Sequence, residues 1–288
     1  MSTENGAGSP GNPRGVRRED GPAHRMSDRM NLRAAPRGWS ADVLLWAYWP
    51  RLDYASGLAL QHRLHAARGR GEIPDVLLVT EHPETVTLGR RGSLADLPLG
   101  PSALAARGIA LYQVGRGGRA TFHGPGQLVA YPIVDLRALQ IGPRRFVETL
   151  ERAAVQVLRA SGIEAEGGIP MPGVWVENRK IAAIGVEILG GITRHGLSLN
   201  LAGELGPFDF MVQCGIANAH ATSVDALGIS PPRPIEVGAA LANELGTALG
   251  LHPREADVTS LLRCKRRANP EGGGRSRLAD LGEHGRMP

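Results

Sequence analysis

Short apolar runs, each bounded by glycine, proline or polar residues, recur through the first half of the chain and predict β-strands. We expect strands at residues 44–49, 76–80, 86–88, 111–114 and 128–134. The run at 76–80 is apolar at nearly every position, which is typical of a buried strand.

Apolar residues at helical spacing predict three helices. The first begins after Asp53, whose side chain can cap it. The second is expected at 143–160, where a proline starts the helix and Gly162 ends it, and the third at 234–251. Their buried stripes are predicted to consist of Leu60, Leu64 and Ala67, of Phe146, Leu150, Ala154, Val157 and Leu158, and of Val237, Leu241, Leu245 and Leu249.

Three further strands are predicted at 173–176, 180–189 and 195–201, separated by turns at 178–179 and at 190–191. Short turns between consecutive strands make this an antiparallel meander. Strands and helices do not alternate regularly along the chain, which argues against a doubly wound fold. The predicted class is therefore α+β, with a mixed or antiparallel sheet and flanking helices.

Between two predicted strands lies the polar, glycine-rich segment 116–127, which we expect to be a loop. Its glycines and proline alone would also suit an ordinary tight hairpin. Its polar side chains exceed what a turn needs, and they make this segment the first candidate for a binding site: Arg116, Thr121, His123 and Gln127.

The same segment imitates a dinucleotide-binding fingerprint at Gly115-x-Gly117-x-x-Ala120. That motif must open a helix, and Gly124-Pro125-Gly126 does not allow one here. The Gly-x4-Gly-Lys-Ser/Thr phosphate-binding motif does not occur in the chain. The sequence thus gives little support to a nucleotide site.

The net charge of +5 is concentrated at the two ends of the 288-residue chain. Residues 1–40 carry +3 and residues 263–288 carry +4, which leaves −2 for residues 41–262. Because both ends lack apolar periodicity, we predict a disordered basic arm at 1–40, one catalytic domain at 41–262, and a flexible basic tail at 263–288. A non-catalytic alternative is a module that binds nucleic acid through its tails, although aromatic residues make up only 4% of the chain.

Cysteine and lysine usage singles out two residues. The chain has two cysteines, Cys214 and Cys264, and their spacing fits neither a disulfide framework nor a zinc site. Cys214 precedes a glycine and could be an exposed, reactive thiol, or else a small buried residue. Of 33 basic residues only Lys180 and Lys265 are lysine. Lysine can exchange a proton where arginine cannot, so Lys180 is a candidate for proton transfer, unless it reflects an arginine-biased composition.

Other observations bear on metals and on location. His62 and His65 lie three positions apart on the first predicted helix, but no nearby carboxylate or cysteine completes a metal site. The N-terminus has no apolar signal segment, and no run of eighteen apolar residues occurs. We therefore expect a cytoplasmic protein with no bound metal, no membrane partner and no nucleic acid partner.

The run RGGRATFHGPGQLVAYPIVDL at 116–136 resembles the signature of the lipoyl(octanoyl) transferases. The similarity extends from about residue 52 to residue 251. It implies an enzyme that moves an octanoyl group from octanoyl-acyl carrier protein to a lysine of a lipoyl domain, in 2-oxoacid dehydrogenase subunits and the glycine cleavage H protein. It also implies the catalytic fold shared with biotin and lipoate ligases, with a main mixed sheet, flanking helices and a smaller sheet.

By this resemblance Cys214 is the nucleophile that forms an acyl thioester and Lys180 is its basic partner. The substrate-binding residues that it implies are Arg116, Gly117, Gly118, Arg119, Ala120, Thr121, Phe122, His123, Ala183, Ile184, Gly185, Gly196, Leu197 and Ser198, with Arg90, Gln127 and His195 as secondary candidates. A thioester already stores the energy for transfer, so no cofactor is expected.

Three residues depart from the family pattern, namely Pro172, Ser198 and Gln213. None of them removes a functional group that the mechanism uses. The alternative function is that of an ATP-dependent lipoate–protein ligase, which would share the fold but would not need Cys214.

Overall fold

The structure is a computed structural model that describes residues 17–18, 39–168, 171–211 and 220–257. Most of the predicted arm at 1–40, the whole tail at 263–288 and both cysteines lie outside the described residues. Arg17–Arg18 is described and forms the short strand β1, which pairs in parallel with Tyr112 and Gln113.

The main sheet has nine strands in the order β13-β2-β3-β7-β11-β10-β9-β8, with β12 paired to β10. Its first three strands are parallel, and the next five pairings are antiparallel, which makes the sheet mixed. The strands are β2 (Val43–Trp49), β3 (Asp75–Thr80), β7 (Gln127–Ile133), β8 (Glu166–Gly167), β9 (Val174–Val176), β10 (Arg179–Leu189), β11 (Ile192–Asn200), β12 (His220–Ala221) and β13 (His252–Glu255).

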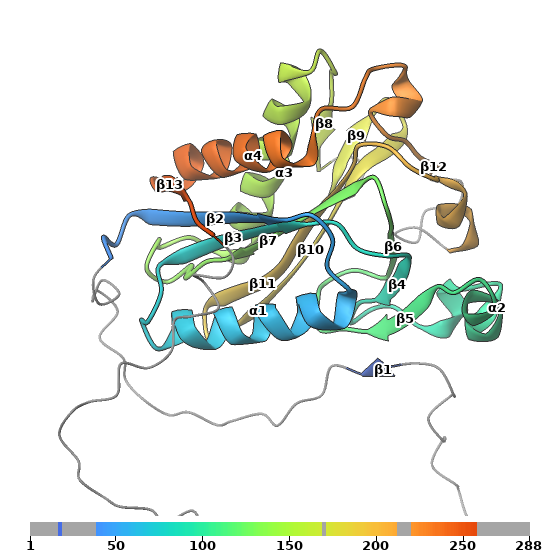
Figure 1. The fold of residues 1–288 in the computed structure, drawn as a ribbon, viewed down its shortest axis with the longest axis horizontal. Helices are drawn as coiled ribbons and strands as arrows, with labels where there is room; N and C mark the ends of the chain where they lie inside the picture. Colours follow the sequence, from blue (N-terminus) through green and yellow to red (C-terminus); the bar gives the residue numbers. More distant parts are fainter. Residues whose placement is uncertain (1–16, 19–38, 169–170, 212–219, 258–288) are drawn as a thin grey trace, which may run out of the picture.

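Helix α1 (Tyr54–Gly69) covers one face of the main sheet, and α3 (Pro143–Ala160) and α4 (Pro234–Leu249) cover the other (Figure 1). Alternate residues of a strand point to opposite faces. In β2, Val43 and Leu45 accordingly pack in the core beneath α1, whereas Leu44 and Trp46 pack in the core beneath α3 and α4. Burial on both faces explains why the strands show unbroken apolar runs.

A smaller sheet has the order β1-β5-β4-β6, from strands β4 (Thr85–Leu88), β5 (Ala110–Gln113) and β6 (Ala120–His123). The one-turn helix η1 (Leu94–Asp96) and α2 (Gly100–Ala106) lie between β4 and β5 in the chain. The prediction of a single loop at 116–127 was therefore wrong for Ala120–His123. These four residues pair antiparallel with Thr85–Leu88, a partner that lies more than thirty positions earlier.

The predicted helices agree closely with the structure. Asp53 caps α1 by accepting a hydrogen bond from the Ser56 amide at 2.9 Å, and α3 spans the expected residues. The third helix ends earlier than expected, at Leu249, because Gly250 takes a left-handed conformation (φ +68°) and β13 follows. The last strand of the meander begins at Ile192 rather than at 195.

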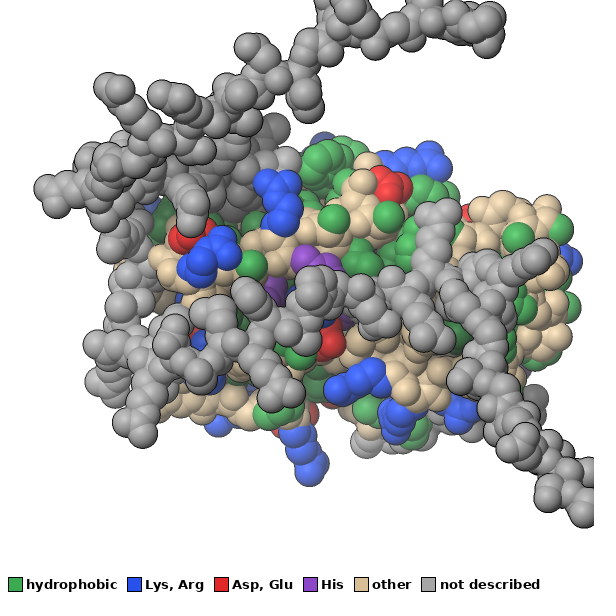
Figure 2. All heavy atoms as spheres, turned by 90° about the horizontal axis from the view of Figure 1, so that it is seen from below, with side chains coloured by type: hydrophobic (Ala, Val, Ile, Leu, Met, Phe, Trp, Pro, Cys, Tyr) green, Lys and Arg blue, Asp and Glu red, His purple; other side chains and the backbone are tan. Residues whose placement is uncertain are grey.

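The remaining elements are short turns of helix, η2 (Gly206–Phe210) and η3 (Asp225–Leu227). No helix in the described ranges is long and apolar enough to cross a membrane. Figure 2 looks at the molecule from the α1 side, where histidine side chains lie among hydrophobic and charged ones. In that region His65 bonds the Leu189 carbonyl and His62 contacts Arg194.

Candidate active site

A pocket opens where the smaller sheet meets β7, β10 and β11 of the main sheet. Its wall includes residues of the glycine-rich segment, of the β10–β11 hairpin and of α1: Tyr54, Arg116, Gly118, Arg119, Ala120, Thr121, His123, Gln127, Val129, Tyr131, Lys180, Ala183, Ile184, Gly185, His195, Gly196, Leu197, Ser198, Asn200, Phe208, Met211 and Ala221. Segments that lie as far apart in the sequence as Tyr54 and Ala221 thus share one cavity.

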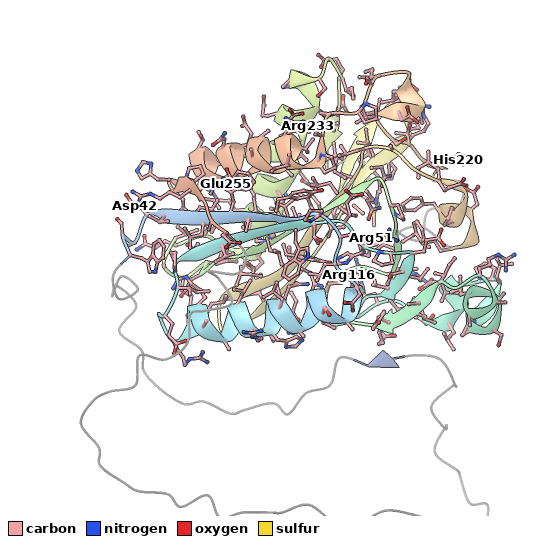
Figure 3. The ribbon with its side chains drawn as sticks, in the orientation of Figure 1. Asp42, Arg51, Arg116, His220, Arg233 and Glu255 are labelled. Carbon is pink, nitrogen blue, oxygen red and sulfur yellow. The ribbon has the colours of Figure 1, made fainter. Side chains whose placement is uncertain are left out.

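Arg116 fastens the glycine-rich segment to the smaller sheet. Its guanidinium donates to the Thr87 carbonyl at 2.7 Å, to Thr87 Oγ1 at 2.7 and 3.2 Å, and to the Gly117 carbonyl at 3.0 Å. The side chain is buried near the N-terminal end of α1 (Figure 3). The Gly117 amide donates to the Val186 carbonyl of β10 at 2.9 Å, so this loop connects the two sheets.

Arg119 is held by a buried carboxylate. Its Nε and Nη2 donate to Asp96 Oδ1 at 2.9 and 2.6 Å. Burial by itself raises the pKa of Asp96, but the hydrogen bonds from Arg119 and from the Ser93 amide hold that pKa below its usual value. Asp96 is therefore ionised and fixes Arg119 at the edge of the pocket.

The pocket wall contains a chain of hydrogen bonds that ends at the backbone of Lys180. His123 Nδ1 donates to Gln127 Oε1 at 2.7 Å, and Gln127 Nε2 donates to Asn200 Oδ1 at 2.9 Å. Asn200 Nδ2 donates to the Thr222 carbonyl, and the Thr222 amide donates to the Lys180 carbonyl, both at 2.9 Å. The side-chain amides of Gln127 and Asn200 both donate and accept hydrogen bonds in this series. These bonds fix the orientations of the two amides and of the His123 ring.

His123 is neutral in this setting. Burial, and after it the neighbouring His82, lowers the pKa of His123 to about 3. Because Gln127 Oε1 can only accept, the ring carries its proton on Nδ1 and leaves Nε2 as an acceptor.

A second buried histidine supports the pocket from behind. His82 Nδ1 donates to the Leu52 carbonyl at 2.6 Å, and its Nε2 accepts from the Tyr131 hydroxyl at 2.7 Å. Burial lowers the pKa of His82 to about 4 and raises that of Tyr131 well above its usual value. The rings of Tyr54 and His123 stack with centroids 5.9 Å apart, which completes an aromatic wall.

Lys180 is 5% exposed and its Nζ atom has defined neighbours. The Nζ atom donates to the Pro172 carbonyl at 3.3 Å and lies 4.5 Å from the centroid of the Trp175 ring. The adjacent Gly173 needs to be glycine, since its φ is +132° and a Cβ would lie 2.7 Å from the Ala182 carbonyl oxygen. Strand β10 also has an irregularity in its pairing with β9 between Lys180 and Ala182.

Glu151 of α3 orders the segment that holds Lys180. Its Oε1 accepts from the Gly173 amide at 3.0 Å, next to the carbonyl that receives the lysine. Burial raises the pKa of Glu151, and the Gly173 amide and the positive charge of Lys180 oppose that rise. Sequence reasoning missed Glu151 because it lies inside the apolar stripe pattern of a helix.

The floor of the pocket is the β10–β11 hairpin. Ala183 pairs with Ser198, Ile184 with Leu197, and Gly185 with Gly196. The two segments that the resemblance implied are thus direct neighbours across the hairpin. Glycine is needed at the last pair, because a Cβ on Gly196 would lie 2.3 Å from the Ala130 carbonyl oxygen.

His195 has an unusual backbone for a non-glycine residue, with φ +57°. Its amide donates to Gln61 Oε1 of α1 at 2.7 Å. Its Nε2 lies 4.0 Å from Glu187 Oε2, and this carboxylate pairs with Arg194 at 2.5 Å. The backbone turn at His195 therefore brings its ring to the pocket beside a buried ion pair.

Most of the residues implied by the resemblance line the pocket, and three do not. Gly117 bonds β10 from behind the wall, and Phe122 packs against Phe208 in the core of the smaller sheet with ring centroids 5.6 Å apart. Arg90 is exposed, and its amide donates to the Arg116 carbonyl at 2.9 Å. Cys214 lies outside the described residues, although Met211 and Ala221 on either side of that gap both line the pocket.

Sequence reasoning missed seven other pocket residues, namely Tyr54, Val129, Tyr131, Asn200, Phe208, Met211 and Ala221. They stand in apolar runs or at an element boundary, where nothing local marks them as part of a site. Among the described residues no group of three or more His, Cys, Asp or Glu side chains could hold a metal ion.

Comparison with known proteins identifies the class of this domain. Residues 53–246 match the family model described as the lipoyl protein ligase A/B catalytic domain. Among solved structures, the bi-partite lipoate protein ligase of Thermoplasma acidophilum, studied with its E2 lipoyl domain, superposes with a TM-score of 0.57. The two sequences are 18% identical, and the superposition covers 75% of this chain and 86% of the ligase chain. The two proteins therefore share a fold.

Relatives of known name narrow the class to one activity. The octanoyltransferase of Solibacter usitatus is 47% identical over 180 residues, or 62% of this chain and 81% of the relative. The mitochondrial octanoyltransferase LIP2 of Arabidopsis thaliana is 44% identical over 174 residues, or 60% of this chain and 74% of the relative. The chain belongs to the lipoyl(octanoyl) transferase family and is an acyltransferase.

Proposed function

We propose that the protein moves an octanoyl group from octanoyl-acyl carrier protein to a lysine of a lipoyl domain, through a thioester on Cys214. One observation carries the proposal: the pocket gathers the glycine-rich segment, the hairpin of small residues and the only lysine of residues 41–262. The acceptors would be lipoyl domains of 2-oxoacid dehydrogenases and the glycine cleavage H protein.

The length of chain near Cys214 supports its role. Met211 lines the pocket three positions before Cys214, and three residues of extended chain reach at most about 10 Å. Ala221 lines the same pocket from the other side of the gap. This connectivity is compatible with a role for Cys214 at the pocket.

The chemistry proceeds in two balanced transfers. Lys180, as a neutral amine, accepts the thiol proton as Cys214 attacks the donor thioester, and it returns this proton to the carrier thiolate as the carrier leaves. The acceptor amine then attacks the acyl-cysteine, loses a proton to the same lysine, and forms an amide while the Cys214 thiol is restored. Ala183, Gly185 and Gly196 line the pocket along the hairpin, where an alkyl chain would lie.

Peptide mapping after incubation with octanoyl-acyl carrier protein tests the intermediate. We expect an octanoyl adduct on Cys214 that hydroxylamine removes, with Cys264→Ser as the matched control that keeps it. An adduct confined to Cys264, or an active Cys214→Ala variant, would overturn the proposal.

Lys180→Arg tests the proton transfer. Arginine keeps the positive charge but stays protonated at any working pH. We expect acyl transfer to fall by about 10²-fold or more, the usual scale for the loss of a general base, while the Cys214 thiol still reacts with an alkylating reagent. Near-normal transfer would leave Lys180 as a counter-charge only.

The alternative is an ATP-dependent lipoate–protein ligase, whose fold this chain shares. Such an enzyme would release pyrophosphate from ATP in the presence of a free fatty acid. We expect transfer without ATP and from the carrier-bound acyl group. A cytoplasmic location would suit a free catalytic thiol, although the similar plant protein is mitochondrial.

A further inference from the structure

Positive charge is distributed unevenly over the catalytic domain. Residues 85–123, which form the smaller sheet and its connections, contain five arginines and a single acidic residue, Asp96. This segment therefore carries +4, whereas residues 41–262 as a whole carry −2. The rest of the domain must carry −6, so the smaller sheet is a basic region on an acidic body.

The basic region keeps its positive charge at the surface. Asp96 is 1% exposed and lies beneath Arg119, whose side chain is 40% exposed. Arg90 and Arg91 are exposed as well. The single carboxylate of the segment is thus hidden, and the charged side chains that the segment exposes are arginines.

Apolar side chains accompany these arginines. Leu94 and Leu99 are 36% and 42% exposed, and they are two of the three large hydrophobic residues that are exposed in the described part of the chain. We call Arg90, Arg91, Leu94, Leu99 and Arg119 the rim surface. Arginine beside exposed apolar residues is the composition expected of a protein interface.

The rim surface is fixed to the pocket by backbone bonds. The Gly89 amide donates to the Arg119 carbonyl at 3.0 Å, the Arg90 amide to the Arg116 carbonyl at 2.9 Å, and the Arg91 amide to the Gly118 carbonyl at 3.1 Å. Close packing enforces this geometry, because a Cβ on Gly89 would lie 2.6 Å from the Gly118 carbonyl oxygen. A partner on the rim surface is therefore held at a set distance from the pocket.

We propose that the rim surface docks the acyl-carrying donor protein through an acidic, partly apolar face of that donor. This proposal rests on the proposed function. Of the two protein substrates, it assigns the donor to the rim surface. The acceptor lysine reaches into the pocket only by the length of its own side chain, so the acceptor protein must sit directly over the pocket. The donor presents its acyl group on a longer prosthetic arm, and its own surface can dock beside the pocket.

Charge reversal at the periphery of the rim surface is the test, with steady-state kinetics on three substrates. For Arg91→Glu we expect KM for octanoyl-acyl carrier protein to rise about tenfold and its salt dependence to weaken, as for other charges at an interface edge. The KM for octanoyl-pantetheine should stay unchanged, because this substrate has no protein surface. The KM for the lipoyl domain should stay unchanged as well. Leu94→Ser should raise the same KM by about threefold.

Arg145→Glu is the matched control, since Arg145 is an exposed arginine on α3, away from the smaller sheet. It should leave all three KM values as in the wild type. A rise in KM for the lipoyl domain would assign the rim surface to the acceptor and overturn the proposal. The proposal would also be overturned if Arg91→Glu left the KM for the carrier unchanged, or if it raised the KM for octanoyl-pantetheine by the same factor. If the wild type does not use the carrier at all, the proposed function itself fails.

Discussion

The main sheet and the smaller sheet differ in size, in covering and in charge. The main sheet is covered on both faces by helices, and its strands contribute side chains to two large cores. The smaller sheet has three strands of four residues and the two-residue β1, with one short helix and a small core beside it. The two arginines that line the pocket, Arg116 and Arg119, belong to this region. We expect the first region to supply most of the stability and the second to supply contacts with partners, and the pocket lies between them.

The largest effect of a single substitution is expected in the core of the main sheet. Phe146 of α3 is fully buried beneath the sheet. Phe146→Ala should lower the free energy of unfolding by about 3–5 kcal/mol, measured by urea denaturation, because it leaves a cavity. The neighbouring exposed Arg145→Ala should change it by less than about 0.5 kcal/mol. Equal losses for both variants would show that the core is not where the stability lies.

Acid should weaken the region where the two sheets meet. Burial lowers the pKa of His82 to about 4 and that of His123 to about 3, so the unfolded chain binds more protons below pH 6.5. The free energy of unfolding should therefore fall by about 1.4 kcal/mol per pH unit for each ring as pH drops from 6.5 toward 4. His82→Gln should reduce that slope, and an unchanged slope would exclude His82 as its source.

The anchor of the glycine-rich segment should show an intermediate effect. Thr87→Val removes the hydroxyl that accepts from Arg116 and leaves the Thr87 carbonyl in place. We expect a loss of about 2 kcal/mol in the free energy of unfolding, the scale for hydrogen bonds to a charged group. Thr87→Ser, which keeps the hydroxyl, should recover most of it, and failure to do so would point to packing instead.

The smallest effect is expected at an exposed ion pair on α3. Arg144 and Glu148 lie one helical turn apart with Nε and Oε1 2.9 Å apart, and both side chains are exposed. Arg144→Ala should cost about 0.3–0.5 kcal/mol at low salt and less at high salt. If Arg144→Ala lowered the free energy of unfolding by more than Thr87→Val does, the expected ranking of these two sites would be wrong.

Local signals in the sequence account for much of the main sheet. Asp53 marks the start of α1, the proline at 143 and Gly162 mark the ends of α3, and the turn at 190–191 marks the hairpin. Each of these signals lies at the end of the element that it defines, or within two residues of it. The residues of the hairpin that line the pocket could be inferred for the same reason, once the family resemblance was recognised.

The strands of the smaller sheet and the edge strand of the main sheet were harder to predict, because the strands with which they pair are distant in the sequence. Strand β6 is defined by its pairing with β4, and β13 by its pairing with β2. Likewise His82 and Asn200 become part of the site only when the fold brings them beside Tyr131 and Gln127. No local pattern contains that information.

The pairing of β13 with β2 has a consequence for how the protein is made. His252 pairs with Val43, so the outer edge of the parallel strands is completed by residues made 209 positions later. During synthesis β2 would wait with one edge unpaired until β13 leaves the ribosome, and unpaired edges are prone to aggregate. Such long sequence separation also slows folding. The final residues of the domain thus act as its closing step, and a chain cut before His252 would be released with an open edge.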